Sequence, residues 1–185
     1  MNVDEPTLYE LSFFSLDLLR LSVVASLIEE SQDVSKDSKL KTAKNIDKSY
    51  LNRNSLGSYY KKHNKDIKVK EFKEGSIELV ISDILPVAGV IVPIILYYLN
   101  KRDNAGNQVI NFTIDSNDAE MVRFLNDVSN RYFGSFDECY DYIRQTLEDR
   151  GYNFEAISDN TYRALKANTS RLEDVVLTTR RISRN

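Results

Sequence analysis

The pattern of apolar positions near the start of the chain predicts a strand followed by a helix. Leu16, Leu19 and Val23 recur at intervals of three and four residues, which predicts a helix over about residues 16–31. The preceding residues 8–14 are rich in aromatic and aliphatic side chains, which favours a strand. We therefore expect one strand and one helix in this part of the chain.

A β-hairpin is the clearest local prediction. Residues 67–72 alternate between apolar and charged side chains, the pattern of a half-buried strand, and residues 77–81 form a second apolar run. The intervening Lys73–Ser76 contains glycine and is typical of a turn. A further alternating run, residues 108–114, predicts another strand.

Residues 84–99 form an apolar segment without a charged side chain. Pro86 suits the first turn of a helix, whereas Pro93 would kink or interrupt that helix. One interpretation is a helix that is covered on all sides and is therefore apolar all round. The alternative is a membrane-associated segment that contains Pro86, Val90, Pro93 and Leu96.

The C-terminal third predicts a helical hairpin. Asp115 or Ser116 is a candidate cap for the first helix, and Gly134 ends that helix. Ser135, with Glu138 three residues later, matches a capping box at the start of the second helix. The expected apolar faces consist of Val122, Leu125, Val128 and Tyr132 in the first helix and of Phe136, Tyr140, Ile143 and Leu147 in the second.

The elements up to residue 114 follow the order strand, helix, strand, strand, helix, strand, which is the split βαβ or ferredoxin-like order. We therefore predict an α+β protein with an antiparallel sheet and both helices on one face, followed by the helical hairpin. Residues 1–114 would form the α+β domain, with a basic insertion at residues 32–65, and residues 115–185 a helical extension with a basic tail. Residues 152–157 predict a short strand, whereas residues 172–179 fit either a helix or a strand.

The composition of the 185 residues excludes several classes of site. One cysteine, Cys139, rules out an intramolecular disulfide framework and any zinc site built on several thiolates. One histidine, His63, rules out two-histidine metal sites within one chain. The sequence has no glycine-rich phosphate loop and no Ser-His-Asp set, so we assign no catalytic residue, metal ligand or cofactor. The acidic start of the chain lacks the positive region of a secretory signal, which predicts a cytoplasmic protein.

Charge is distributed unevenly along the chain. Residues 34–74 contain twelve Lys or Arg and five Asp or Glu, a net charge of +7, whereas the whole chain has a net charge of −3. Such a segment is either a solvated lysine-rich loop or a contact for phosphate groups or for an acidic protein. Candidate phosphate or acidic-partner contacts are Lys61, Lys62, Lys65, Lys68 and Lys70, and candidate partner-binding side chains are Tyr50, Tyr59 and Tyr60.

The run IKVKEFKEGSIELVI over residues 67–81, followed by an apolar helix, resembles a family of small α+β domains. These domains occur in bacterial and phage conflict systems and are akin to the N-terminal domain of the TRADD adaptor. The resemblance covers residues 8–114. It implies a ferredoxin-like sandwich that acts as an assembly adaptor, and it assigns no functional residue.

These observations favour a non-enzymatic interaction or assembly module that binds a protein partner or a second copy of itself. Two alternatives stay open. One is a membrane-associated effector that uses residues 84–99, and the other is a nucleic-acid or nucleotide binder that uses the basic residues 34–74. An RNA-recognition module would show a Lys/Arg-Gly-Phe-like run on a strand, which the sequence lacks.

Overall fold

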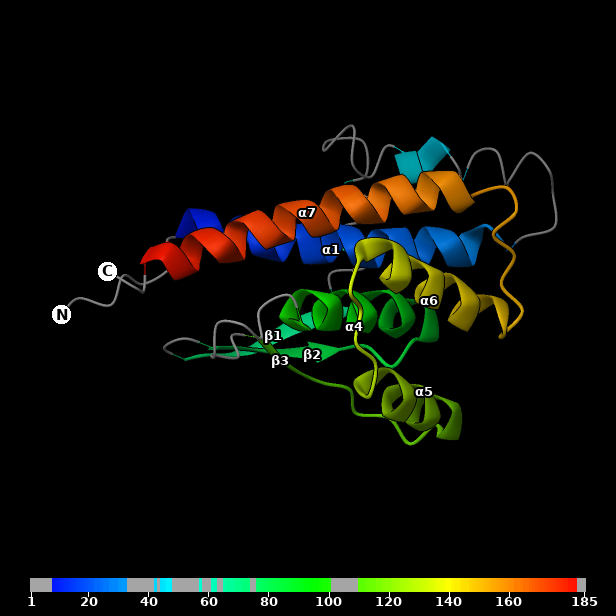
Figure 1. The fold of residues 1–185 in the computed structure, drawn as a ribbon, viewed down its shortest axis with the longest axis horizontal. Helices are drawn as coiled ribbons and strands as arrows, with labels where there is room; N and C mark the ends of the chain where they lie inside the picture. The colour runs from blue at the N-terminus through cyan, green and yellow to red at the C-terminus, as the bar shows by residue number, and fades with distance from the viewer. Residues whose placement is uncertain are drawn as a thin grey trace.

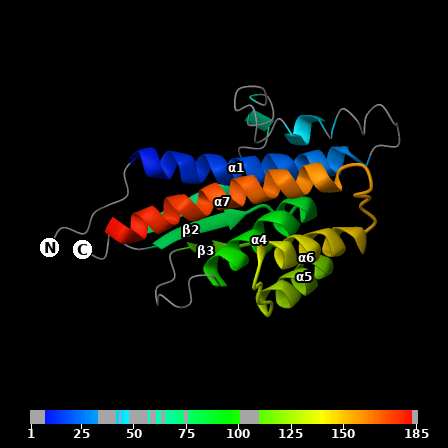
Figure 2. The same ribbon diagram turned by 45° about the horizontal axis from the view of Figure 1, so that its top comes forward.

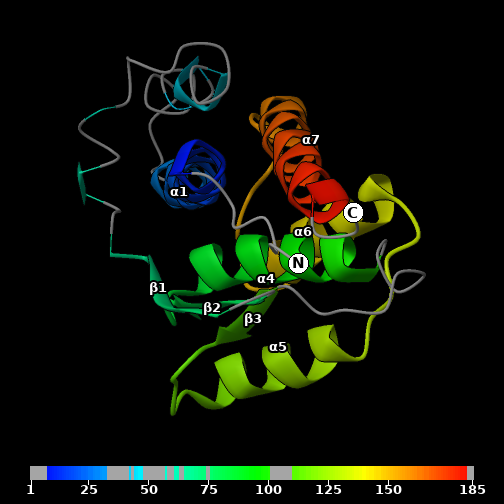
Figure 3. The same cartoon turned by 90° about the vertical axis from the view of Figure 1, so that its left-hand side faces the viewer.

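Two long antiparallel helices, α1 (Leu8–Glu30) and α7 (Ser158–Ile182), lie side by side along one face of the molecule (Figures 1 and 2). The computed structural model describes residues 8–32, 42, 44–47, 57, 61–62, 65–73, 76–100 and 110–182. The helix α4 (Leu85–Asn100) forms the next layer, and a small sheet follows it (Figure 3). The helix α5 (Ala119–Ser129) lies on the side of the sheet away from α1 and α7 (Figures 1 and 3).

The sheet that the described residues form has three strands, in the order β1 (Ile67–Lys73), β2 (Ser76–Ile81) and β3 (Ile110–Thr113). The strands β1 and β2 are antiparallel, and the register shifts between Val69 and Glu71. The strand β3 pairs parallel to β2, so β2, α4 and β3 form one βαβ unit. The predicted hairpin and the predicted strand over residues 108–114 are thus confirmed.

The prediction of a strand over residues 8–14 is wrong, because these residues form the first two turns of α1. A short apolar run without polar alternation fits a buried helix as well as a strand, and here it continues directly into the apolar residues that follow. The α+β class is confirmed. The ferredoxin-like arrangement is not confirmed, because its first strand is helical, β2 and β3 are parallel, and helices lie on both sides of the sheet (Figure 3).

The apolar segment forms the continuous helix α4 at the centre of the core, which confirms the interpretation as a helix covered on all sides. The helix packs against α1 and α6 (Phe136–Glu148). Pro93 lies inside the helix and does not end it. The residue four positions earlier, whose carbonyl faces the proline ring, is Gly89, and a Cβ there would lie 3.3 Å from Leu147 Cδ2. The small residue therefore lets α6 approach α4 closely.

The predicted helical hairpin is confirmed as α5 and α6, with one change of cap. Asp118, rather than Asp115 or Ser116, caps α5, and its Oδ1 accepts a hydrogen bond of 2.8 Å from the Glu120 amide. Ser116 instead accepts a hydrogen bond from the Asp118 amide. The cap of α6 is the predicted one, because Ser135 Oγ accepts from the Glu138 amide at 3.2 Å. Glu138 Oε2 accepts from the Gly134 amide, one residue before the cap.

The predicted apolar face of α6 is confirmed, whereas that of α5 is wrong at two positions. Val122 is 44% exposed and Tyr132, which lies beyond the end of the helix, is 70% exposed. The helix α5 ends at Ser129, with Asn130 as its C-cap, so the helical spacing does not extend to residue 132. The buried residues of α5 are Met121, Phe124 and Val128, and those of α6 include Phe136, Tyr140, Ile143 and Leu147.

Residues 152–157 form a connecting turn, so the predicted short strand is wrong. Gly151 has a φ of 92°, and the Tyr152 amide donates to the Leu147 carbonyl, which turns the chain away from α6. Phe154 and Ile157 are then buried as anchors just before α7 begins. Of the two alternatives for residues 172–179, the helix is right, because all of them belong to α7.

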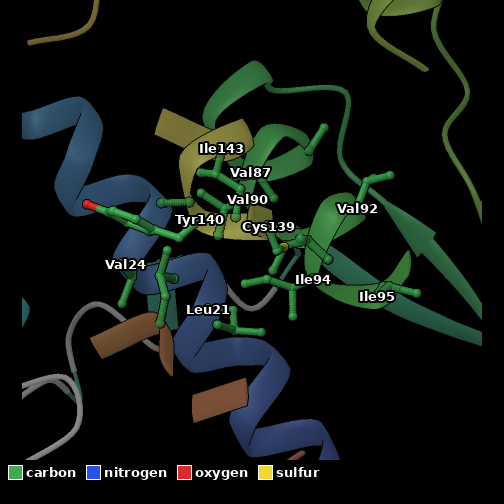
Figure 4. Packing of buried hydrophobic residues seen from close by; sticks show 14 of the residues in the cluster. Leu21, Val24, Val87, Val90, Val92, Ile94, Ile95, Cys139, Tyr140 and Ile143 are labelled. Atoms are coloured by element: carbon green, nitrogen blue, oxygen red, sulfur yellow. The ribbon is translucent and has the colours of Figure 1, made fainter. Parts of the chain in front are cut away.

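A single hydrophobic core contains side chains from both predicted domains, residues 1–114 and residues 115–185. Tyr98 of α4 donates a buried hydrogen bond of 3.0 Å to the Leu172 carbonyl of α7. Burial raises the pKa of the Cys139 thiol, which favours the protonated, unreactive form. Figure 4 shows core side chains of α1, α4 and α6, among them Leu21, Val24, Val87, Val90, Val92, Ile94, Ile95, Cys139, Tyr140 and Ile143.

Replacing the cap of α6, Ser135→Ala, is expected to lower the free energy of unfolding by about 1 kcal/mol, because the Glu138 amide loses its acceptor. Urea denaturation followed by circular dichroism measures this loss. The matched control is Ser129→Ala, since the Ser129 hydroxyl donates only to the exposed Asn126 carbonyl at the end of α5. Equal losses for the two variants would contradict the assigned cap.

Candidate interaction groove

The structure places the predicted lysine contacts on the surface but pairs two of them within the chain. Lys62 Nζ lies 3.7 Å from Glu30 Oε1, and Lys70 Nζ lies 2.7 Å from Glu78 Oε1. The predicted tyrosines Tyr50, Tyr59 and Tyr60 lie outside the described residues. All five of the predicted contact lysines are exposed: Lys61, Lys62, Lys65, Lys68 and Lys70.

The residues predicted for a membrane segment lie in the core. Pro86, Val90 and Pro93 are buried and Leu96 is half-buried, since α4 is covered by other helices. Among the helices that the structure describes, none combines the length and the apolar character needed to cross a membrane.

A groove with a cavity volume of about 770 Å³ lies between α5 and α6, next to the loop that joins them. Aromatic rings and charged side chains of both signs line it. Four of the lining side chains are acidic: Asp127, Glu138, Asp141 and Asp149. Four others are arginines: Arg123, Arg131, Arg144 and Arg150.

The acidic side chains of the groove already have partners. Asp127 Oδ2 accepts a hydrogen bond of 2.8 Å from the Tyr142 hydroxyl, and Asp127 Oδ1 lies 3.3 Å from Arg131 Nη2. Asp149 Oδ1 accepts a hydrogen bond of 2.7 Å from the side-chain Nε2 of Gln145. Glu138 accepts from the backbone as part of the α6 cap, and Asp141 lies 3.8 Å from Arg144. Each of the four carboxylates in the groove therefore has at least one partner within the chain.

Several of the arginine donors, in contrast, are not used by the chain. Arg123 is exposed and makes no hydrogen bond or ion pair with the described residues. The Nε of Arg144 is buried without an acceptor. Arg150 donates from Nη1 to the Thr146 carbonyl, and its guanidinium lies 6.0 Å from the Phe124 ring centroid. The groove thus presents N–H groups of Arg123 and Arg144 that no acceptor of the described residues takes up.

One wall of the groove is stiffened by a contact between Tyr142, Arg131 and Asp127. The Arg131 guanidinium lies 5.1 Å from the centre of the Tyr142 ring. Burial and the hydrogen bond to Asp127 raise the pKa of Tyr142 to about 12. The Tyr142 hydrogen bond in turn lowers the pKa of Asp127. Tyr142 therefore keeps its proton at neutral pH and donates a hydrogen bond to the ionised Asp127 carboxylate.

Sequence reasoning missed this groove, because it assigned Tyr132 to the apolar face of a longer helix. The Tyr132 ring is instead the most exposed large hydrophobic side chain of the described part of the chain. The sequence signal was the short stretch Arg131–Gly134, in which an arginine and two aromatic residues precede a helix-breaking glycine. Helical spacing alone cannot tell such a loop from the last turn of a helix.

Within the described residues, no three His, Cys, Asp or Glu side chains are grouped so that they could hold a metal ion. The groove therefore offers hydrogen-bond donors and aromatic surface to a ligand. Comparison with known proteins found no matching family model, no matching curated protein and no matching solved structure.

Proposed function

We propose that the protein is an interaction module and that the groove between α5 and α6 binds an acidic segment of a partner protein. The observation that carries this proposal is the exposed Tyr132 beside arginines whose N–H groups the chain does not use. Tyrosine and arginine are the residue types that contribute most to protein interfaces. The proposal agrees with the adaptor role that the sequence resemblance implies.

The balance of donors and acceptors gives the chemistry of the partner. A basic segment would compete with Tyr142 and Gln145 for carboxylates that are already paired, whereas an acidic segment supplies acceptors for Arg123 and Arg150. The Tyr132 ring adds apolar contact area at a low cost in conformational entropy. We therefore expect the bound segment to combine carboxylates with an aromatic or aliphatic side chain.

The test is fluorescence anisotropy with a fluorescein-labelled peptide of sequence Glu-Glu-Phe-Glu-Glu-Phe and its counterpart with glutamine in place of glutamate. We expect the acidic peptide to bind and the glutamine peptide to show no binding. Arg123→Ala and Tyr132→Ala are each expected to weaken binding roughly fivefold, which corresponds to about 1 kcal/mol. Raising the salt concentration should also weaken the binding of the acidic peptide.

The matched control is Arg163→Ala, which removes an arginine that is also exposed but lies on α7, outside the groove. This variant should bind the acidic peptide as tightly as the unchanged protein. Equal binding of the acidic and glutamine peptides, or an equal effect of Arg123→Ala and Arg163→Ala, would show that the groove is not the binding site.

A nucleic-acid binder remains the second candidate, because Lys61, Lys65 and Lys68 are exposed and form no ion pair with the described residues. The same anisotropy assay with a labelled oligothymidine separates the two. Binding that is lost in Lys65→Glu and Lys68→Glu but unchanged in Arg123→Ala would favour this candidate over the groove.

A further inference from the structure

The helices α5 and α6 run in opposite directions along the two sides of the groove. The guanidinium group of Arg150, just after the end of α6, lies 6.0 Å from the ring centroid of Phe124 in α5. Further along α5, Asp127 accepts the hydrogen bond of 2.8 Å from Tyr142, which lies earlier in α6. The Phe133 ring, beyond the end of α5, has its centroid 5.4 Å from that of Tyr142. Later residues of α5 therefore face earlier residues of α6, and the groove has two distinct ends.

One end of the groove presents guanidinium groups. Arg123 and Arg150 both line the groove, and Arg123 directly precedes Phe124, whose ring faces Arg150. Arg123 is exposed and forms no hydrogen bond or ion pair with the described residues. Arg150 uses its Nη1, which donates to the Thr146 carbonyl at 2.8 Å. Since a guanidinium group binds a carboxylate through two parallel hydrogen bonds, this arginine end suits the carboxylates of a ligand.

The opposite end of the groove presents aromatic rings. Tyr132 and Phe133 line it, and Tyr132 is 70% exposed. The arginine at this end, Arg131, is already engaged, because its Nη2 lies 3.3 Å from Asp127 Oδ1 and its guanidinium group lies 5.1 Å from the Tyr142 ring centroid. This aromatic end therefore offers a ring for apolar or stacking contact rather than a vacant charge.

The region between the two ends sets the spacing of the groups that the groove can bind. The Tyr142 hydrogen bond lowers the pKa of Asp127, so a ligand carboxylate placed beside Asp127 would meet a like charge. From Arg123 to Ser129 the helix α5 rises about 9 Å, and Tyr132 lies beyond its end. An extended peptide advances about 3.3 Å per residue, so it covers this distance in about four residues.

We propose that the groove binds an extended segment whose carboxylates and aromatic side chain lie about four positions apart, with uncharged residues between them. This inference rests on the proposed function and adds the order and spacing of the recognised groups. The carboxylates contact Arg123 and Arg150, the aromatic side chain packs on Tyr132, and the uncharged residues pass Asp127. Contact at both ends strengthens binding because the second contact forms within one bound chain.

The experiment uses unlabelled peptides of identical composition, each with an acetylated and an amidated end, to displace the labelled peptide Glu-Glu-Phe-Glu-Glu-Phe from the whole chain. Glu-Glu-Gly-Ser-Gly-Phe and its reverse, Phe-Gly-Ser-Gly-Glu-Glu, have the spaced arrangement, whereas Gly-Ser-Gly-Glu-Glu-Phe has adjacent groups. At least one spaced peptide should displace the label at a concentration roughly fivefold lower than the adjacent peptide does. Equal displacement by all three would overturn the spacing but leave the proposed function intact. If the labelled peptide itself did not bind, the proposed function would fail, and this inference with it.

Variants at the two ends identify where the spaced peptide binds. In Tyr132→Ala the advantage of the spaced peptide over the adjacent one should fall below about twofold, because only the arginine end remains. Arg123→Ala should reduce the same advantage by weakening the other end. Arg163→Ala, outside the groove, should keep it in full. An advantage that persists in Tyr132→Ala, or that is lost equally in Arg163→Ala, would contradict binding across both ends.

Discussion

Replacing Val90 with aspartate is expected to unfold the protein in buffer. Val90 is fully buried near the middle of α4, which is surrounded by α1 and α6. An ionised carboxylate at this position would have no partner, and burying it costs several kcal/mol or shifts its pKa far upward. Since a folded domain is typically stable by only about 5–15 kcal/mol, this single change removes most or all of the stability. Circular dichroism and urea denaturation measure the effect.

The matched control is Val122→Asp, the same chemical change at a valine that is 44% exposed on α5. It should alter the free energy of unfolding by no more than about 0.5 kcal/mol. A Val90→Asp protein that keeps its fold in buffer would contradict the assignment of α4 to the core. If that protein also lost binding to lipid vesicles, the membrane interpretation of residues 84–99 would be favoured instead.

The second large effect is expected from Arg20→Met. Arg20 and Asp17 of α1 are both buried, and Arg20 Nη1 donates a hydrogen bond of 2.5 Å to Asp17 Oδ1. The variant leaves the Asp17 carboxylate buried with only the Arg171 contact at 3.3 Å. Removing one partner of a buried ion pair typically costs about 3–5 kcal/mol, and the loss here should lie at the lower end of that range because Arg171 still faces Asp17. The loss should appear at neutral pH as a lower urea midpoint.

The loss in Arg20→Met should also depend on pH. Burial raises the pKa of Asp17 above its ordinary value, while Arg171 and Arg20 act in the opposite direction. Removing Arg20 leaves burial less opposed, so the pKa of Asp17 rises further in the folded variant. The folded protein then binds a proton at a pH where the unfolded chain does not, and the deficit shrinks as the pH falls through the folded pKa toward the ordinary value of 3.8.

Two comparisons make this prediction specific. The double variant Asp17→Leu with Arg20→Met removes both charges and should recover much of the stability that Arg20→Met loses. Arg163→Met breaks an exposed ion pair between α7 and Asp47 and should cost less than about 1 kcal/mol. An Arg20→Met protein as stable as the unchanged one at neutral pH would show that Arg20 does not compensate Asp17.

Elements with a strong local signal could be predicted from the sequence. The hairpin over residues 67–81, the helix α4 and the apolar face of α6 each depend on a pattern within a dozen or so neighbouring residues. The strand predicted at residues 8–14 was wrong because this short run of aromatic and aliphatic residues fits a helix as well as a strand, and it continues into the helix that follows. The buried face of α5 was predicted wrongly because Met121–Val122 and Phe124–Leu125 are adjacent apolar pairs, and spacing alone does not show which member of each pair is buried.

The candidate groove and the buried polar contacts between α1 and α7 could not be predicted, for a different reason. Asp17 and Arg20 are visible in the sequence as opposite charges three residues apart within an apolar run. Their partner Arg171, however, comes from the far end of the chain, and no local pattern joins the two. The same holds for the groove, where the availability of Arg123 depends on what the neighbouring carboxylates bind after folding.

The pairing of α1 with α7 has a consequence for how the chain is synthesised. Residues 31–157 separate the two helices, so α1 leaves the ribosome on the order of ten seconds before α7 at about 5–20 residues per second. During that interval the apolar side chains of α1 lack the helix that later covers one of their sides. Contacts this distant in sequence also slow folding. Nascent chains should therefore depend on a chaperone until α7 docks, and docking of α7 should be the slow step of refolding.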